Sequence, residues 1–198
     1  MNTAHNPWQT IAEKKIYDNK WISLTEFDVI NPSGGAGIYG VVHFKNTAVG
    51  VVPVDDQGHI WLVGQYRYPL KQFSWEIPEG GCPANESTLE AAARELAEET
   101  GIVAARYEPL VTMHLSNSVS DEAAIIYLAT GLSFNTPNPE ETEELHVKKV
   151  TLAEAMSMIQ SGDITDSMSV AALQQVYIRQ LEQALAESTG EPVTPLQA

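Results

Sequence analysis

Residues 80–102 read GGCPANESTLEAAARELAEETGI and carry the clearest helical pattern of the chain. This pattern predicts a helix over residues 86–100, with Asn85 as the N-cap, Glu86 in the first turn and Gly101 as the C-terminal stop. One face of this helix is apolar at helical spacing and consists of Leu89, Ala92, Ala93 and Leu96. Because these side chains are small, we expect the helix to pack closely against a sheet.

A second face of the same helix is acidic. Glu95, Glu98 and Glu99 fall within an arc of about 100°. Like charges at this spacing repel each other by about a few tenths of a kcal/mol per pair. Arg94 lies four residues from both Glu90 and Glu98 and offsets part of the repulsion. Such a face is either a solvated helix surface or a site where Mg²⁺ joins carboxylates to a phosphate.

The residues before the helix favour the metal site. Gly80 and Gly81 allow the backbone to approach a ligand closely. The preceding run over residues 74–79, SWEIPE, is unusual for a plain surface connection.

Composition limits the class of protein and its partners. The chain has 198 residues, 43% hydrophobic and 19% charged, which suits one globular domain with a sizeable core. A net charge of −15 disfavours nucleic acid and acidic lipid as partners. A small phosphate ester would also be repelled unless a bound cation attracted it. The N-terminus lacks a signal-peptide pattern and Cys82 is the only cysteine, so we expect a cytoplasmic protein without internal disulfides.

The remaining pattern predicts an α/β or α+β fold with a mixed sheet. Residues 14–45 are β-rich, with two strand-like runs on either side of the turn NPSGGAG. Residues 48–54 and 59–68 predict a hairpin. Later strands are expected at 107–114, 124–129 and 146–150, helices at 151–160 and 168–186, and an acidic loop at 135–144.

The helical stretch resembles the Nudix box, Gly-x5-Glu-x7-Arg-Glu-aliphatic-x-Glu-Glu-x-Gly-aliphatic. The matching residues are Gly80, Glu86, Arg94, Glu95, Leu96, Glu98, Glu99, Gly101 and Ile102, with every gap of the right length. The flanking runs QYRYP (65–69) and WEIP (75–78) resemble the branch that hydrolyses ADP-ribose and nucleotide sugars. The resemblance extends roughly from residue 14 to residue 185.

The resemblance implies an α/β/α sandwich with a mixed sheet and a small N-terminal β subdomain. We expect residues 1–46 to form that subdomain and to support a homodimer, residues 47–187 to form the hydrolase domain, and residues 188–198 to form a flexible tail. Trp75 is expected to pack at a subunit contact.

The resemblance also implies roles for individual residues. Mg²⁺, with Mn²⁺ as the alternative, would be bound by Glu95, Glu98, Glu99 and the carbonyl of Glu79. The structural residues of the box would be Gly80, Glu86, Arg94 and Gly101. Catalysis would involve Glu99 and a general base on the acidic loop, with Glu141 the first candidate and Glu143 the second. That loop has an alternative interpretation as an acidic surface segment.

Substrate contacts are expected at Arg67, Ser118, Ser120 and Glu122. The chain departs from ADP-ribose hydrolases at Ser116-Asn117-Ser118, where they typically have Ser-Pro-Gly. We therefore expect hydrolysis of a nucleoside diphosphate sugar, such as ADP-ribose or GDP-mannose, to a nucleoside monophosphate and a sugar phosphate. The alternatives are another diphosphate (a dinucleoside polyphosphate, NADH or capped RNA) and a nucleotide-binding module without catalysis.

Overall fold

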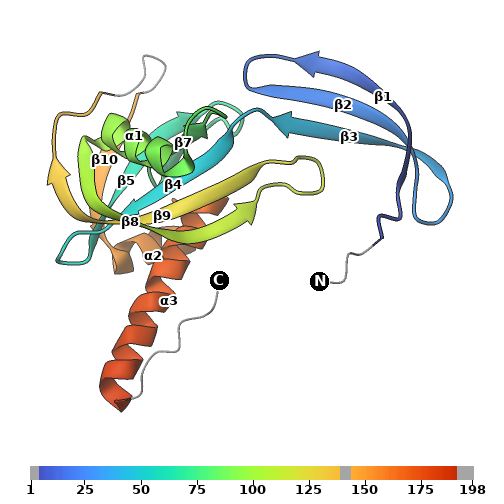
Figure 1. Ribbon diagram of the computed structural model, residues 1–198. Helices are drawn as coiled ribbons and strands as arrows, with labels where there is room; N and C mark the ends of the chain where they lie inside the picture. The colour runs from blue at the N-terminus through green and yellow to red at the C-terminus, as the bar shows by residue number, and fades with distance from the viewer. Residues whose placement is uncertain (1–4, 139–143, 191–198) are drawn as a thin grey trace.

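The computed structural model describes residues 5–138 and 144–190, and a small N-terminal sheet stands beside a layered body (Figure 1). In this sheet β1 (Gln9–Asp18), β2 (Ile22–Ile30) and β3 (Ala36–Phe44) pair antiparallel in chain order. The sequence predicted one run where β1 and β2 lie. The side chain of Asn19 separates them, because its Oδ1 accepts hydrogen bonds from the amides of Trp21 and Ile22, both at 2.8 Å.

Two further sheets form the centre of the body. One has the order β7 (Glu79–Cys82), β4 (Thr47–Pro53), β9 (Ala123–Phe134), β8 (Ile102–His114). The other has the order β10 (His146–Thr151), β5 (His59–Arg67), β6 (Gln72–Glu76). Strands β4 and β9 are parallel and the other pairs are antiparallel, so the predicted mixed sheet is confirmed. β8 and β9 are longer than predicted because their pairing continues to Ile102 and Phe134.

The predicted hairpin over residues 48–68 is wrong. β4 and β5 belong to different sheets and are joined by a single bridge between Val54 and Ile60. β4 is buried on both faces, with Val51 in one hydrophobic cluster and Val52 in the other. A strand buried in this way is interior to its sheet, and β4 pairs with β7 on one side and β9 on the other.

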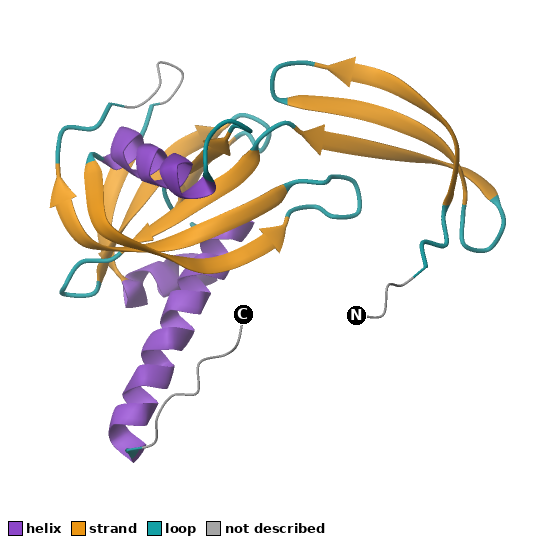
Figure 2. Cartoon of the chain, in the orientation of Figure 1, coloured by secondary structure: helices purple, strands orange, loops and turns teal. Residues whose placement is uncertain are grey.

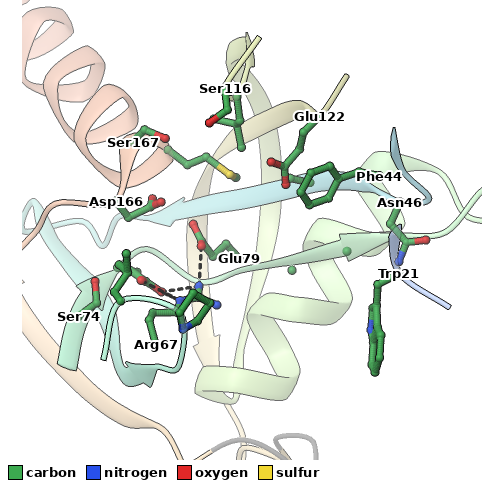
Figure 3. Close-up of a pocket in the computed structure, with 18 of the residues that line it drawn as sticks. Trp21, Phe44, Asn46, Arg67, Ser74, Glu79, Ser116, Glu122, Asp166 and Ser167 are labelled. Atoms are coloured by element: carbon green, nitrogen blue, oxygen red, sulfur yellow. Dashed lines mark hydrogen bonds and ion pairs between the residues drawn. The ribbon is translucent and has the colours of Figure 1, made fainter. Parts of the chain in front are cut away.

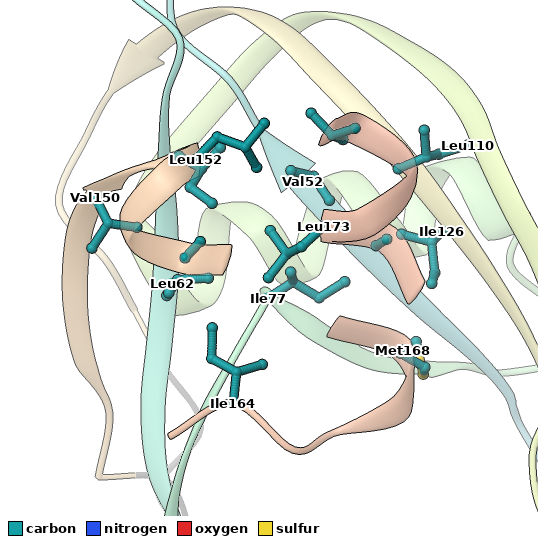
Figure 4. Close-up of a cluster of buried hydrophobic side chains, with 14 of the residues drawn as sticks. Val52, Leu62, Ile77, Leu110, Ile126, Val150, Leu152, Ile164, Met168 and Leu173 are labelled. Carbon is teal, nitrogen blue, oxygen red and sulfur yellow. The ribbon is translucent and has the colours of Figure 1, made fainter. Parts of the chain in front are cut away.

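The helices cover opposite faces of the sheets, which confirms the α/β/α sandwich (Figure 2). On one side α1 (Thr88–Thr100) packs its buried Ala92 and Leu96 against Val49 and Val51. On the other side α2 (Leu152–Ser161) and α3 (Ser167–Thr189) enclose the larger cluster, drawn in Figure 4. In the part of the chain that the structure describes, no helix is both long and apolar enough to cross a bilayer.

Helix α1 starts two residues later than predicted. Ser87, not Asn85, is the N-cap, because it forms a reciprocal capping box with Glu90. The buried face also differs from the prediction, since Leu89 is 45% exposed and Ala91 is fully buried. The buried face is therefore rotated from the predicted one and also includes Glu99 and Thr100.

We predict that Leu173→Ala in α3 lowers the free energy of unfolding by about 2–5 kcal/mol, because Leu173 is fully buried in the larger cluster. Leu181→Ala is the matched control, since Leu181 lies on the same helix and is 52% exposed. It should change the free energy by less than about 0.5 kcal/mol. Urea unfolding of both variants checks this, and equal losses would contradict the packing described.

Candidate active site

The acidic helix α1 lies directly against the glycine strand β7. The backbone N–H of Glu79 donates to Oε2 of Glu99 at 3.0 Å, and Glu99 is only 2% exposed. A Cβ placed on Gly80 would lie 2.2 Å from the carboxyl carbon of Glu95. Only glycine fits at residue 80 without moving that carboxylate, so the strand and the acidic face are in contact.

Arg94 connects the acidic face to the loop before the helix. Its Nη1 donates to Glu95 at 2.8 Å and to Glu98 at 3.0 Å. Its Nε and Nη2 donate to the two carboxylate oxygens of Glu86, and Nη2 also donates to the carbonyl of Gly81 at 3.1 Å. One positive charge thus faces three carboxylates, which leaves the face negative. The pKa of the Arg94 guanidinium is raised, first by its bonds to Glu86 and then by Glu95 and Glu98.

Gly101 ends the helix in the left-handed conformation, with φ of 71°. A Cβ at this position would lie 2.2 Å from the carbonyl oxygen of Asn135. Conformation and space therefore both require glycine here, and the chain can turn directly into β8.

A cavity of about 620 Å³ opens beside β7. The wall nearest the N-terminal sheet includes Trp21, Phe44 and Asn46, and the opposite wall includes Asp166 and Ser167 at the start of α3 (Figure 3). In Figure 3 the side chains of Glu79, Asp166 and Glu122 point toward the same space. The cavity therefore gathers residues from distant parts of the chain around an acidic centre.

Arg67 is held in this cavity by two carboxylates. It forms a forked pair with Glu76, at 2.9 Å from Nε to Oε1 and 2.5 Å from Nη2 to Oε2. Its Nη2 also donates to Glu79 at 2.8 Å. The predicted substrate contact is thus placed in the cavity, but its charge is already shared with two glutamates.

The acidic lining shifts the pKa values of two carboxyl groups. Burial raises the pKa of Glu79 well above its usual value, and the charges of Asp166 and Glu76 add to the effect. Glu79 Oε2 is buried and has no hydrogen-bond partner in the described residues. Burial also raises the pKa of Glu122, followed by the charges of Asp166 and Asp121. Both carboxylates would therefore gain from a cation or a hydrogen-bond donor supplied by a ligand.

Strand β7 lies between the cavity and the acidic helix. Glu79, Gly80 and Gly81 all line the cavity, and Gly80 also contacts Glu95 on the helix. The lining of the cavity does not include Glu95, Glu98 or Glu99. Within residues 5–138 and 144–190, no three His, Cys, Asp or Glu side chains are gathered as a ready metal cage. Two of the predicted ligands, Glu95 and Glu98, accept hydrogen bonds from Arg94.

The other predicted site residues fall into three groups. Glu122 lines the cavity. Ser118 and Ser120 do not; the Ser118 carbonyl accepts a bond from the Tyr39 hydroxyl, and the Ser120 hydroxyl donates to the Leu115 carbonyl. Glu141 and Glu143 lie outside the residues that the structure describes.

Sequence reasoning missed two carboxylates in the cavity, Asp166 and Glu76. Asp166 is the N-cap of α3, and its position just before a helical run is the signal that could have identified the cap. Glu76 is 2% exposed and binds Arg67. Trp75, expected at a subunit contact, is partly buried beside Phe73 and has the ammonium of Lys148 over its ring.

Two family models match the chain. The model described as NUDIX domain matches residues 44–169, and the model described as Nucleoside diphosphate sugar hydrolase N-terminal domain matches residues 8–42. Together they cover the N-terminal sheet and the body up to the first turn of α3.

Similar proteins and a similar solved structure agree with these matches. The ADP-ribose pyrophosphatase of Bacillus subtilis is 34% identical, over 89% of this chain and 96% of that protein. The ADP-ribose pyrophosphatase of Mycobacterium tuberculosis is also 34% identical, over 88% of this chain and 85% of that protein. A solved structure titled as an ADP compounds hydrolase has a TM-score of 0.79 at 21% identity and covers 96% of this chain and all of its own. That structure supports the fold.

We predict that Arg94→Lys lowers the free energy of unfolding by about 1–3 kcal/mol. Lysine keeps the charge but cannot make the forked bond to Glu86 together with the bonds to Glu95 and Gly81. Arg179→Lys is the control, because Arg179 has one ion pair, with the exposed Glu108. Its effect should stay within about 0.5 kcal/mol. Similar losses in the two variants, measured by denaturant unfolding, would contradict the role assigned to Arg94.

Proposed function

We infer the function from the family, because this chain belongs to the Nudix hydrolases. We propose that it hydrolyses the diphosphate linkage of a nucleoside diphosphate sugar. The products would be a nucleoside monophosphate and a sugar phosphate. The names of the similar proteins and the N-terminal family match support ADP-ribose or a relative such as GDP-mannose as substrate.

The observation that carries this proposal is the position of β7 between two features. Its Glu79 amide bonds Glu99, and its Gly80 contacts Glu95. The same strand contributes Glu79, Gly80 and Gly81 to the lining of the cavity. A diphosphate at this strand would lie next to the acidic helix, while the rest of the substrate extended into the cavity.

Mg²⁺ is the proposed cofactor, with Mn²⁺ as the alternative. The residues that would hold it are Glu95, Glu98, Glu99 and the carbonyl of Glu79, all oxygen donors of the kind that hard cations prefer. The residues fit this use, because Arg94 supplies one positive charge against three carboxylates, and the missing side chain of Gly80 lets the Glu95 carboxylate lie against the backbone of β7. When bound, such a cation polarises phosphoryl oxygens and lowers the pKa of a bound water.

The chain's own side chains would orient the substrate. Arg67 would meet a substrate phosphate, with Glu76 fixing its fork toward the cavity. Glu122 would accept hydrogen bonds from sugar hydroxyls. The proposed general base is Glu141, with Glu143 as the second candidate.

We predict that Glu99→Gln lowers kcat/KM by at least about 100-fold, since even an outer partner of a metal ligand is worth about 10- to 100-fold. The assay is release of AMP or GMP with Mg²⁺ from ADP-ribose, GDP-mannose, ADP-glucose and UDP-glucose. Glu108→Gln, at an exposed carboxylate away from β7, is the control and should keep full activity.

Extending the panel to NADH, diadenosine polyphosphates and capped RNA separates the alternatives. If the enzyme turned over only one of these compounds, that compound and not a nucleotide sugar would be the substrate. Binding of ADP-ribose without turnover of any compound would overturn the enzyme assignment in favour of a binding module.

We also propose that residues 1–46 form a dimerisation subdomain next to a hydrolase domain at 47–187. Of the tail expected at 188–198, residues 188 and 189 belong to α3, and residues 191–198 lie outside the described part of the chain. A three-stranded sheet is close to the limit of independent stability, and this one exposes apolar side chains. Ile11 is 63%, Trp21 59% and Ile38 69% exposed. A second copy of the chain would cover them.

Sedimentation tests the homodimer. We predict a dimer at micromolar concentration and a dissociation constant raised at least about 10-fold by Ile38→Asp, because an unpaired charge would enter an apolar interface. Leu185→Asp, at a 63% exposed position on α3, should not change the mass. A monomeric wild-type chain would remove the proposal.

A further inference from the structure

The N-terminal sheet is hydrogen-bonded to the loop of residues 115–122, which joins β8 to β9 and lines part of the cavity. The amide of Val42 in β3 donates to the carbonyl of Val119 at 2.8 Å, and the amide of Asp121 donates back to Val42 at 3.2 Å. The loop thus pairs with the free edge of β3, and Val42 and Ser120 form a parallel bridge. The loop therefore covers the outer edge of β3 at Val42.

The side chain of Asp121 adds further hydrogen bonds between this loop and the end of β3. Its Oδ1 accepts the amide of Phe44 at 3.0 Å, and its Oδ2 pairs with Nδ1 of His43 at 2.5 Å. The hydroxyl of Tyr39 donates to the carbonyl of Ser118 at 2.7 Å. Tyr39, His43 and Phe44 of β3 therefore all form hydrogen bonds with residues of the loop.

The fastened loop positions part of the cavity wall. Leu115, Ser116 and Glu122 line the cavity from its two ends. The amide of Leu115 donates to the carbonyl of Glu122 at 2.9 Å, so the two ends are tied together. In Figure 3 Glu122 lies beside Phe44, the residue whose amide binds Asp121. A movement of the loop away from β3 would therefore move Glu122 in the cavity.

We propose that Asp121 and His43 are positioning residues that hold Glu122 against the substrate, so that the N-terminal sheet sets part of the substrate affinity. This inference rests on the proposed function. His43 and Asp121 are about half exposed, and exposed ion pairs contribute little to global stability. The pair can therefore fix the loop without being needed for folding.

The test is a double-mutant cycle between His43→Ala and Glu122→Gln, with KM and kcat measured separately on the best substrate of the panel. His43→Ala should raise KM about 2- to 5-fold, as expected for loss of an exposed ion pair, and leave kcat within about 2-fold. If His43 acts through Glu122, the double variant should have the KM of Glu122→Gln alone. Tyr39→Phe, which removes only the hydroxyl bonded to Ser118, should shift KM in the same direction and less.

Glu108→Ala is the control variant, because it breaks an exposed ion pair with Arg179 that lies on other elements. It should change neither KM nor kcat. Effects of His43→Ala and Glu122→Gln that multiply in the double variant would overturn the proposal, and so would an unchanged KM in His43→Ala.

Hydrogen exchange gives a readout that does not depend on activity. Amides in the peptide 115–122 should exchange at least about 2-fold faster in Asp121→Ala, while those of α2 and α3 keep their rates. Unchanged exchange in 115–122 would overturn the proposal even in an active enzyme. The wild-type chain could cleave no compound of the panel while Asp121→Ala still exchanged faster in 115–122. That outcome would overturn the proposed function and would support only the role of Asp121 in holding the loop.

Discussion

The sharing of one guanidinium among three carboxylates is the constraint on which the site depends. Arg94 bonds Glu86, Glu95 and Glu98 and also reaches the carbonyl of Gly81. Without that cation the carboxylates of Glu95 and Glu98 would repel each other across a single helical turn. The same guanidinium also donates to the carbonyl of Gly81 in β7. Arg94 therefore both offsets the charge of the carboxylates and holds the helix against the strand.

The short strand β7 borders both the acidic helix and the cavity. Gly80 contacts the carboxylate of Glu95 and also lines the cavity, and Glu79 bonds Arg67 there and feels the charge of Asp166. Carboxylates therefore lie on both sides of the strand, in a chain whose net charge is −15. An anionic ligand at β7 would be repelled by these carboxylates, and a cation bound with it would reduce that repulsion.

Periodicity and spacing in the sequence were sufficient to predict the acidic helix and the mixed sheet, whereas the α/β/α sandwich was expected from the resemblance to the Nudix family. Pairing between distant strands was not predictable in this way: the β4–β5 hairpin was wrong because β4 pairs with β7 and β9 instead. The N-cap was misplaced because Asn85 and Ser87 are both good caps, and the reciprocal bond of Glu90 decides between them. Arg67 and Glu122 were expected in the cavity, whereas Asp166 and Glu76 were not, since the contacts that place them there join elements far apart in the chain.

The parallel pairing of β4 with β9 has a consequence for synthesis on the ribosome. β4 occupies residues 47–53 but cannot complete its sheet until β9, at residues 123–134, has left the exit tunnel. The cavity needs still more of the chain, because its lining runs from Trp21 to Met168. During translation the N-terminal sheet can form early, since its strands are neighbours in sequence, whereas the exposed valines of β4 have to wait. The cavity can therefore be complete only after the start of α3 has also left the tunnel, late in the synthesis of the chain.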